Sequence, residues 1–363
     1  MKIFTLILSL LLLAPPSQAQ KRLVIIDQDG SGPADSNQMS LMVLLQSLQV
    51  EVLGISIVTG NAWRDEEVQH TLRMLELIGR SNVPVVPGAV FPLVRTQQET
   101  QIAMQSIGRP AWLGAWGGRE QDVALAAGGV IVDVATHGPW NIPPLREGSP
   151  HTKALAEDAA HFLVRQVHAH PHEVTIFAFG PLTNIALAVA IDPKFAELTK
   201  GIVIMGSSMN PQTDDPEFAT SPRQEFNFWF DPEAARMALR AQWPRIDITT
   251  ADISIKAMFT KDMYDEISRS SSPAAKYIAT YATERYYLWD ELAACAWLDP
   301  SILTNVVEVY MDVDLSHGPS YGHTLTWSEK LRPSAVNIPL VHAQLDLNLP
   351  KFRKMFVDLM SGR

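Results

Sequence analysis

Cysteine, basic residues and long apolar runs are all scarce in this sequence. The single cysteine, Cys295, excludes an internal disulfide and any site in which several cysteines hold zinc or an iron–sulfur cluster. Lysine and arginine number 29 against 39 aspartate and glutamate residues, so the formal net charge is −10. Nucleic-acid binding needs a basic surface, so we expect no nucleic-acid partner. The apolar content of 47% is nevertheless that of a folded globular protein.

One apolar run stands at the N-terminus. Ile3–Leu13 follows Lys2, and the small residues Ser17 and Ala19 precede an expected cleavage point. This order is typical of a secretory signal peptide, and the run is shorter than the roughly 18 residues that span a bilayer. We therefore expect residues 1–19 to be removed and residues 20–363 to form a periplasmic or secreted protein with no membrane contact.

The rest of the chain alternates between short apolar runs and helical patterns. Such alternation predicts an α/β fold, with a mainly parallel open sheet flanked by helices in a single domain. The expected strands are 22–26, 50–59, 83–87, 174–179, 201–205, 246–248, 307–314 and 336–345. The expected helices are 38–48, 66–79, 153–168, 180–190 with Pro181 in its first turn, 232–239, 277–298 and 350–360.

Residues 92–150 follow neither pattern well. They are rich in glycine, proline and tryptophan, and only 128–135 is clearly apolar. We expect long loops here, forming a lid over an active site.

Polar side chains gather where the first two predicted strands end. Asp27, Asp29, Asp35 and Asn37 follow the first strand, and Asn61 follows the second. In open α/β sheets, ligands bind beyond the carboxyl ends of the strands, and oxygen donors suit Ca²⁺ or Mg²⁺. Such residues also cap helices and shape turns. Two carboxylates one residue apart, however, repel each other unless a cation or strong donors lie between them.

Several segments together resemble one enzyme family. The chain is similar to the calcium-dependent nucleoside hydrolases, also called inosine–uridine-preferring nucleoside hydrolases, over nearly the whole mature sequence. The similar segments are Ile25–Gly30 (IIDQDG), Glu51–Asn61 (EVLGISIVTGN), Phe179–Asn184 (FGPLTN), Met205-Gly206, Gln224–Ala235 (QEFNFWFDPEAA) and Leu345–Met360. The resemblance implies hydrolysis of the N-glycosidic bond of a ribonucleoside, or of a related N-riboside, to base and ribose.

The resemblance also implies roles for individual residues. Asp29 would bind Ca²⁺ and act as the general base toward the attacking water. The Phe179 carbonyl and Asp290 would complete the metal site. The substrate would be bound by Asn61, Asn210, Glu225, Asn227 and Trp289. The nucleobase would stack on aromatic rings, for which Trp112, Trp116, Trp140 and Trp289 are the candidates.

The chain departs from the family pattern at two points. Where the family has a pair of aspartates that includes a metal ligand, this chain has Ser36 and Asn37, so the ligand is either the Asn37 carbonyl oxygen or Asp35. Where many members have a histidine that protonates the leaving base, this chain has Trp289, whose indole cannot supply a proton. Help for the leaving group then comes from stacking, from water or from another side chain such as Tyr286. His137 and His151, in the expected lid, are further candidates.

Two other functions are compatible with parts of the sequence. IIDQDG also resembles the opening motif of haloacid dehalogenase-type phosphatases, in which Asp27 would be the nucleophile and Asp29 the acid/base with Mg²⁺. Loss of the aspartate pair and of the histidine would instead suit a non-catalytic protein that binds a nucleoside or sugar. The base preference and the oligomeric state, a homo-oligomer included, stay open.

Overall fold

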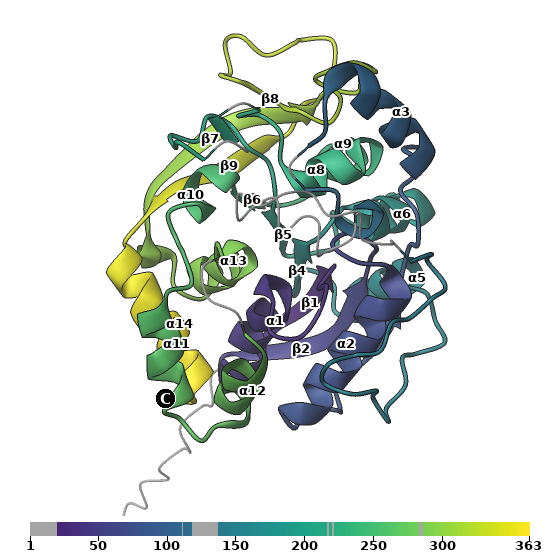
Figure 1. Cartoon of the computed structure of the whole chain (residues 1–363). Coiled ribbons are helices and arrows are strands. Elements are labelled where there is room, and N and C mark those ends of the chain that lie inside the picture. Colours follow the sequence, from purple (N-terminus) through teal and green to yellow (C-terminus); the bar gives the residue numbers. More distant parts are fainter. Residues whose placement is uncertain (1–19, 111, 118–136, 216–217, 220, 283–285) are drawn as a thin grey trace, which may run out of the picture.

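One mixed β-sheet forms the centre of the molecule (Figure 1). The computed structural model describes residues 20–363 except 111, 118–136, 216–217, 220 and 283–285. Within these residues the sheet has nine strands in the order β3-β2-β1-β4-β5-β6-β9-β7-β8. Neighbours from β3 to β9 are parallel, and β7 runs antiparallel to β9 and β8. The strands are β1 (Arg22–Gln28), β2 (Val50–Ile57), β3 (Val85–Pro87), β4 (Val174–Phe179), β5 (Gly201–Met205), β6 (Ile246–Thr249), β7 (Leu303–Val313), β8 (Thr324–Trp327) and β9 (Leu340–Leu347).

Helices cover both faces of this sheet, which confirms the expected fold class (Figure 1). No helix of the described chain is long and apolar enough to cross a membrane. The α-helices are α1 (Ser36–Gln46), α2 (Arg64–Leu77), α3 (Gln97–Ile107), α5 (Ala159–Ala169), α6 (Thr183–Ile191), α8 (Phe226–Phe230), α9 (Pro232–Leu239), α10 (Ala251–Ser254), α11 (Lys261–Ser268), α12 (Pro273–Tyr281), α13 (Trp289–Leu298) and α14 (Leu349–Ser361). Two 3₁₀ turns are η1 (Gly114–Trp116) and η2 (Pro300–Ile302).

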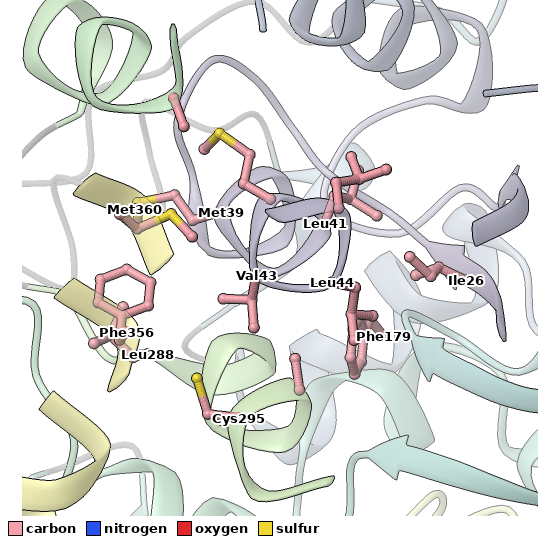
Figure 2. Close-up of a cluster of buried hydrophobic side chains, with 14 of the residues drawn as sticks. Ile26, Met39, Leu41, Val43, Leu44, Phe179, Leu288, Cys295, Phe356 and Met360 are labelled. Carbon is pink, nitrogen blue, oxygen red and sulfur yellow. The ribbon is translucent and has the colours of Figure 1, made fainter. Parts of the chain in front are cut away.

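Side chains on the two faces of the sheet pack into two separate hydrophobic clusters. Successive side chains of a strand point to opposite faces, so Ile26 joins the cluster with α1, α13 and α14, whereas Ile25 joins the cluster with α5, α6 and α9. Figure 2 shows the first cluster, in which Val43 of α1 lies among side chains that include Cys295 of α13 and Phe356 of α14. Cys295 is therefore a core residue. This packing fixes α1 and α13 beside the strand ends that carry the site.

Most expected elements are present, but four expectations about helices are wrong. Residues 97–107 form helix α3 in the stretch expected to be loop, because Thr96 caps it by accepting a hydrogen bond from the Glu99 backbone N–H. Helix α5 begins at Ala159 rather than near residue 153, because the Asp158 side chain caps its first turn. Helix α6 begins at Thr183, so Pro181 lies outside it. Residues 128–135 lie outside the described residues.

The long helix expected over 277–298 is also wrong, because it is two helices. α12 ends at Tyr281 and α13 begins at Trp289. Between them, Tyr287 forms an isolated antiparallel bridge with Met258, and the Leu288 backbone N–H donates to the Ala257 carbonyl at 2.7 Å. These main-chain bonds are long-range and leave no trace in the helical periodicity of the segment. The break places Asp290 in the first turn of α13.

Candidate functional site

Parallel pairing brings the carboxyl ends of three strands together. β1 lies between β2 and β4, and its last residue Gln28 pairs with Ile57 and Phe179. The loops that follow meet around Asp29 with no room for side chains: a Cβ on Gly60 would lie 2.1 Å from Asp29 Oδ2, and a Cβ on Gly180 would lie 2.9 Å from Asp29 Cβ. Only glycine fits at either position. This close approach explains why both sequence motifs contain glycine where they follow a strand.

Asp27 has a structural role. Its Oδ1 accepts hydrogen bonds from the Ser56 hydroxyl and, at 2.7 Å, from the Asn184 amide of the FGPLTN segment. The side chain is fully buried, and this burial raises its pKa to about 7. Asp27 thus ties β1 to β2 and α6, and it is not exposed as the nucleophile of a phosphatase would have to be.

Asp29 is the buried carboxylate on which the loops converge. Its Oδ2 accepts from the Asn61 backbone N–H at 3.1 Å, and its Oδ1 accepts from the Asn37 side-chain amide at 2.8 Å. The same Asn37 nitrogen donates to the Phe179 carbonyl at 2.8 Å. Burial raises the pKa of Asp29 well above its ordinary value, and the negative charges of Asp35 and Glu225 add to the rise. Asp29 is therefore a desolvated carboxylate with a raised proton affinity.

The structure separates the two residues that the sequence left open as metal ligands. Asp35 is the N-cap of α1: its Oδ1 accepts from the Gln38 backbone N–H at 2.8 Å, and its Oδ2 accepts from those of Ser31 at 2.6 Å and Gly32 at 3.1 Å. The loop between β1 and α1 thus folds around the Asp35 carboxylate. Asn37, the second residue of the helix, is the residue that contacts Asp29 and the Phe179 carbonyl.

Asp290 approaches from the far end of the sequence on helix α13. The first turns of α1 and α13 are joined by Ser36, whose hydroxyl donates to Glu291 at 2.6 Å and accepts from the Trp289 backbone N–H at 3.3 Å. Asp290 is buried, and among the described residues its Oδ1 has no hydrogen-bond partner. Its pKa is raised well above the ordinary value by burial first, then by the charges of Glu291 and Asp29.

These donors fit a hard divalent cation. The charge of Asp29 helps to raise the pKa of Asp290, and the unpartnered oxygen of Asp290 is costly to bury unless something binds it. Within the described part of the chain no group of three or more His, Cys, Asp or Glu side chains could hold a metal. The cation would therefore depend on the Phe179 carbonyl and the Asn37 amide oxygen as well as on Asp29 and Asp290, a set of oxygen donors that suits Ca²⁺.

The expected ribose-binding residues lie at the end of β5 and in helix α8. Glu225 caps α8, accepting from the Asn227 backbone N–H at 2.8 Å and from that of Phe228 at 3.1 Å, and it also accepts from that of Ser207 at 3.0 Å. Burial raises the pKa of Glu225 to about 7. The Asn227 amide donates to the Met205 carbonyl at 3.1 Å. Asn210 is exposed, and its backbone N–H donates to Asp252 at 2.8 Å.

The four tryptophans expected near the nucleobase differ in burial and in the residues they contact. Trp289 is half-buried, with Tyr287 at 5.2 Å and Phe218 at 5.9 Å between ring centroids. Trp116 is buried and stacked on Phe230 at 4.4 Å, which is a packing role. Trp140 is exposed on an edge contact with Phe91. Trp112 donates its indole N–H to Asn61 Oδ1 at 2.7 Å.

A buried charge cluster outside this site was not expected from the sequence. His70 of α2 contacts Glu147, and Glu66 one turn earlier lies 3.0 Å from His137 Nε2. The spacing of Glu66 and His70 is a weak signal for such a pair, and Glu147 is too distant in sequence to be inferred. The cluster ties the segment that contains His137 to α2. His137 thus has a carboxylate partner, and the exposed His151 donates its backbone N–H to Glu76 at 2.6 Å.

Comparison with known proteins identifies the family. A model described as inosine-uridine preferring nucleoside hydrolase matches residues 24–354. The chain belongs to this family. Its sequence is 26% identical to "Probable uridine nucleosidase 2" of Arabidopsis thaliana, with 93% of this chain and 97% of that protein aligned. It is 24% identical to the pyrimidine-specific ribonucleoside hydrolase RihB of Escherichia coli O157:H7, over 84% of this chain and 87% of RihB.

A solved structure agrees on the fold. The plant nucleoside hydrolase PpNRh1 superposes with a TM-score of 0.70 at 23% identity, covering 94% of this chain and 99% of that chain. Membership of the nucleoside hydrolase family makes the chain an N-glycosyl hydrolase that acts on ribonucleosides, in a metal-dependent family. The expected recognition, fold and enzyme class are confirmed, and the family match accounts for IIDQDG without a phosphatase.

Proposed function

We propose that this chain hydrolyses the N-glycosidic bond of ribonucleosides, or of a related N-riboside, with Asp29 as general base and Ca²⁺ as cofactor. The observation that carries the proposal is the convergence of Asp29, the Phe179 carbonyl and Asn37 within hydrogen-bond distance at the carboxyl end of the sheet. Ligands bind at this edge in open α/β folds.

Asp29 takes the proton from the attacking water. A general base works best when its pKa lies near the working pH, and burial moves the pKa of Asp29 upward from that of an ordinary aspartate. The Asn61 backbone N–H holds Oδ2 at 3.1 Å, so the carboxylate presents a fixed orientation. The surrounding carboxylates, Asp290 and Glu225, stabilise the positive charge that develops on the ribose ring.

Asp29, Asp290, the Phe179 carbonyl and the Asn37 amide oxygen would hold the calcium ion. When bound, the ion would lower the pKa of a water molecule and orient the ribose hydroxyls. Carboxylate and carbonyl oxygens in a site without sulfur or imidazole favour Ca²⁺ over transition metals.

Asn61, Glu225 and Asn227 would bind the ribose hydroxyls, and Trp289 would stack on the nucleobase. The Tyr286 hydroxyl donates to the Ala34 carbonyl at 3.4 Å and lies 3.5 Å from Met39 Sδ, so the main chain and the core already engage this hydroxyl. We therefore assign help for the leaving base to stacking on Trp289 rather than to an acid. Aromatic stacking is stronger for the larger purine bases, so we expect inosine to be cleaved faster than uridine.

The remaining expectations concern location and assembly. We propose that residues 1–19 are a cleaved signal peptide. Residues 20–363 would then act as one catalytic unit in the periplasm or outside the cell, without a membrane anchor. We also propose that the protein forms homo-oligomers. Determination of the N-terminus of the exported protein and its mass in solution test these points.

The activity is tested by incubating the purified protein with inosine, adenosine, guanosine, uridine or cytidine in CaCl₂ and assaying free ribose. We expect release, a loss of about 10²–10⁴-fold in kcat for Asp29→Asn, and no change for Asp262→Asn on the exposed face of α11. Removal of calcium with a chelator should abolish release, and added calcium should restore it.

Other results would contradict the proposal in distinguishable ways. Saturable nucleoside binding without ribose release would favour a non-catalytic binding protein. Release of phosphate from phosphomonoesters would favour a phosphatase. Ribose release that survives in Asp29→Asn would remove Asp29 from the chemistry.

A further inference from the structure

A chain of hydrogen bonds runs from Trp112 into the site. The Trp112 indole N–H donates to Asn61 Oδ1 at 2.7 Å. The Asn61 amide nitrogen donates to Asn37 Oδ1 at 3.3 Å. The Asn37 amide nitrogen then donates to Asp29 Oδ1 and to the Phe179 carbonyl, both at 2.8 Å. We call these four residues, Trp112, Asn61, Asn37 and Asp29, the amide relay.

The direction of the relay is fixed at both ends. An amide can be turned to exchange its oxygen and nitrogen, so an isolated asparagine could point either way. An indole N–H is only a donor, so Asn61 must turn its oxygen toward Trp112 and its nitrogen toward Asn37. The Phe179 main-chain carbonyl oxygen is only an acceptor, so Asn37 must turn its nitrogen toward Phe179, and the same nitrogen then faces Asp29. Each end imposes the same orientation on the two amides.

This orientation opposes a cation at the same oxygens. Asn37 can ligate a metal only through Oδ1, and in the relay that oxygen faces Asn61 while the amide nitrogen faces two expected ligands. Turning Asn37 would place its nitrogen against the Asn61 nitrogen. Turning Asn61 as well would place its nitrogen against the Trp112 N–H. The rearrangement is complete only when Trp112 releases Asn61.

The segment that carries Trp112 is anchored independently of this bond. The Ala115 backbone N–H donates to the Gly60 carbonyl at 2.9 Å. Gly114, at φ +56°, approaches so closely that a Cβ there would lie 2.1 Å from the same carbonyl. Trp112 can therefore give up its bond to Asn61 without displacement of η1 from the Gly60-Asn61 turn.

We propose that Trp112 is a positioning residue that holds Asn37 as a donor, so that cation binding at Asp29 requires the amide relay to reverse. The inference rests on the proposed calcium site. The cation affinity of this chain is then set in part by Trp112, although Trp112 does not touch the cation. Loss of the Trp112 donor should strengthen calcium binding, whereas a merely structural defect at Trp112 would weaken it.

The test is calorimetric titration of the purified mature protein, residues 20–363, with CaCl₂, together with thermal unfolding midpoints with and without CaCl₂. Trp112→Phe keeps an aromatic ring but removes the donor, and we expect its calcium affinity to rise about threefold to tenfold, the worth of one hydrogen bond. Asn37→Asp removes the amide and adds a charged ligand, and we expect an affinity gain of about tenfold or more. Without calcium its midpoint should fall, because a further buried carboxylate then faces Asp29.

Trp243→Phe is the matched control. Its indole N–H donates to the Ala238 carbonyl at 2.7 Å, away from the relay, so its calcium affinity should equal that of the unsubstituted protein. An unchanged or weaker affinity in Trp112→Phe would overturn the inference. So would equal affinities of Asn37→Asp and the unsubstituted protein.

The ribose assay separates this inference from the proposed function. Ribose release with identical calcium affinities in all variants would refute the relay and leave the hydrolase intact. Tighter calcium binding in both variants without cleavage of any ribonucleoside would support the relay and refute the proposed activity. Absence of calcium binding in every variant would refute the relay and the calcium assignment together.

Discussion

A buried ion pair should make the stability of this protein depend on pH in the neutral to alkaline range. His70 of α2 and Glu147 are 5% and 4% exposed and lie in direct contact, and Glu66 Oε1 is 3.7 Å from His70 Nε2. Burial lowers the pKa of His70, but the hydrogen bonds and charges of the two glutamates outweigh it and raise the pKa from 6.5 to about 9.

The sign follows from the raised pKa. Because the folded protein holds the proton more tightly than the unfolded chain, the stabilisation is fully present below pH 6.5 and is lost as the pH rises through about 9. The difference in pKa corresponds to about 3 kcal/mol of unfolding free energy. His70→Gln cannot be protonated in this range, so it should lack this part of the pH dependence and be less stable than the unsubstituted protein below about pH 9.

Urea unfolding at about pH 6 and about pH 9.5 measures the difference. We expect the unsubstituted protein to lose about 3 kcal/mol more than His70→Gln between the two pH values. His168→Gln is the control, because His168 is paired with Asp192 at the surface, where ion pairs contribute little. Parallel pH profiles for the unsubstituted protein and His70→Gln would refute the reasoning.

Three further predictions concern packing, a buried carboxylate and the nucleobase. Gly54→Ala would bring a Cβ within 2.4 Å of the Phe162 ring, so we expect urea unfolding to show a loss of about 1–3 kcal/mol; no loss would mean that the ring moves freely. Asn184→Ala removes a donor from buried Asp27 and should lower the unfolding free energy by about 1–3 kcal/mol, and an unchanged thermal midpoint would contradict the structural role of Asp27. Trp289→Ala should raise KM for ribonucleosides about fivefold to a hundredfold by loss of stacking, and an unchanged KM would remove Trp289 from the nucleobase site.

Much of the site could be predicted because its residues follow strands. The apolar run of β1 and the carboxylates after it locate Asp29 at the carboxyl edge of a parallel sheet, and the glycines of GN and FGP mark loops that approach one another closely. The positions of apolar residues, from which strands and helices are predicted, can be read directly from the sequence. The apolar pattern does not indicate helix α3 or the break before α13, because a helix cap and a few main-chain hydrogen bonds determine them.

The sequence by itself determined the α/β class, the order of most elements, the enzyme family and the carboxylates that can carry its chemistry. Tertiary structure alone placed Asp35 at the N-cap of α1 and Asn37 beside Asp29, gave Asp27 a structural role and linked Trp112 to the site through Asn61. The physical reason is the distance in sequence between the groups that interact. Patterns of apolar and turn residues express interactions between neighbours in sequence, whereas the direction of a buried amide depends on donors and acceptors that meet only when distant loops fold together.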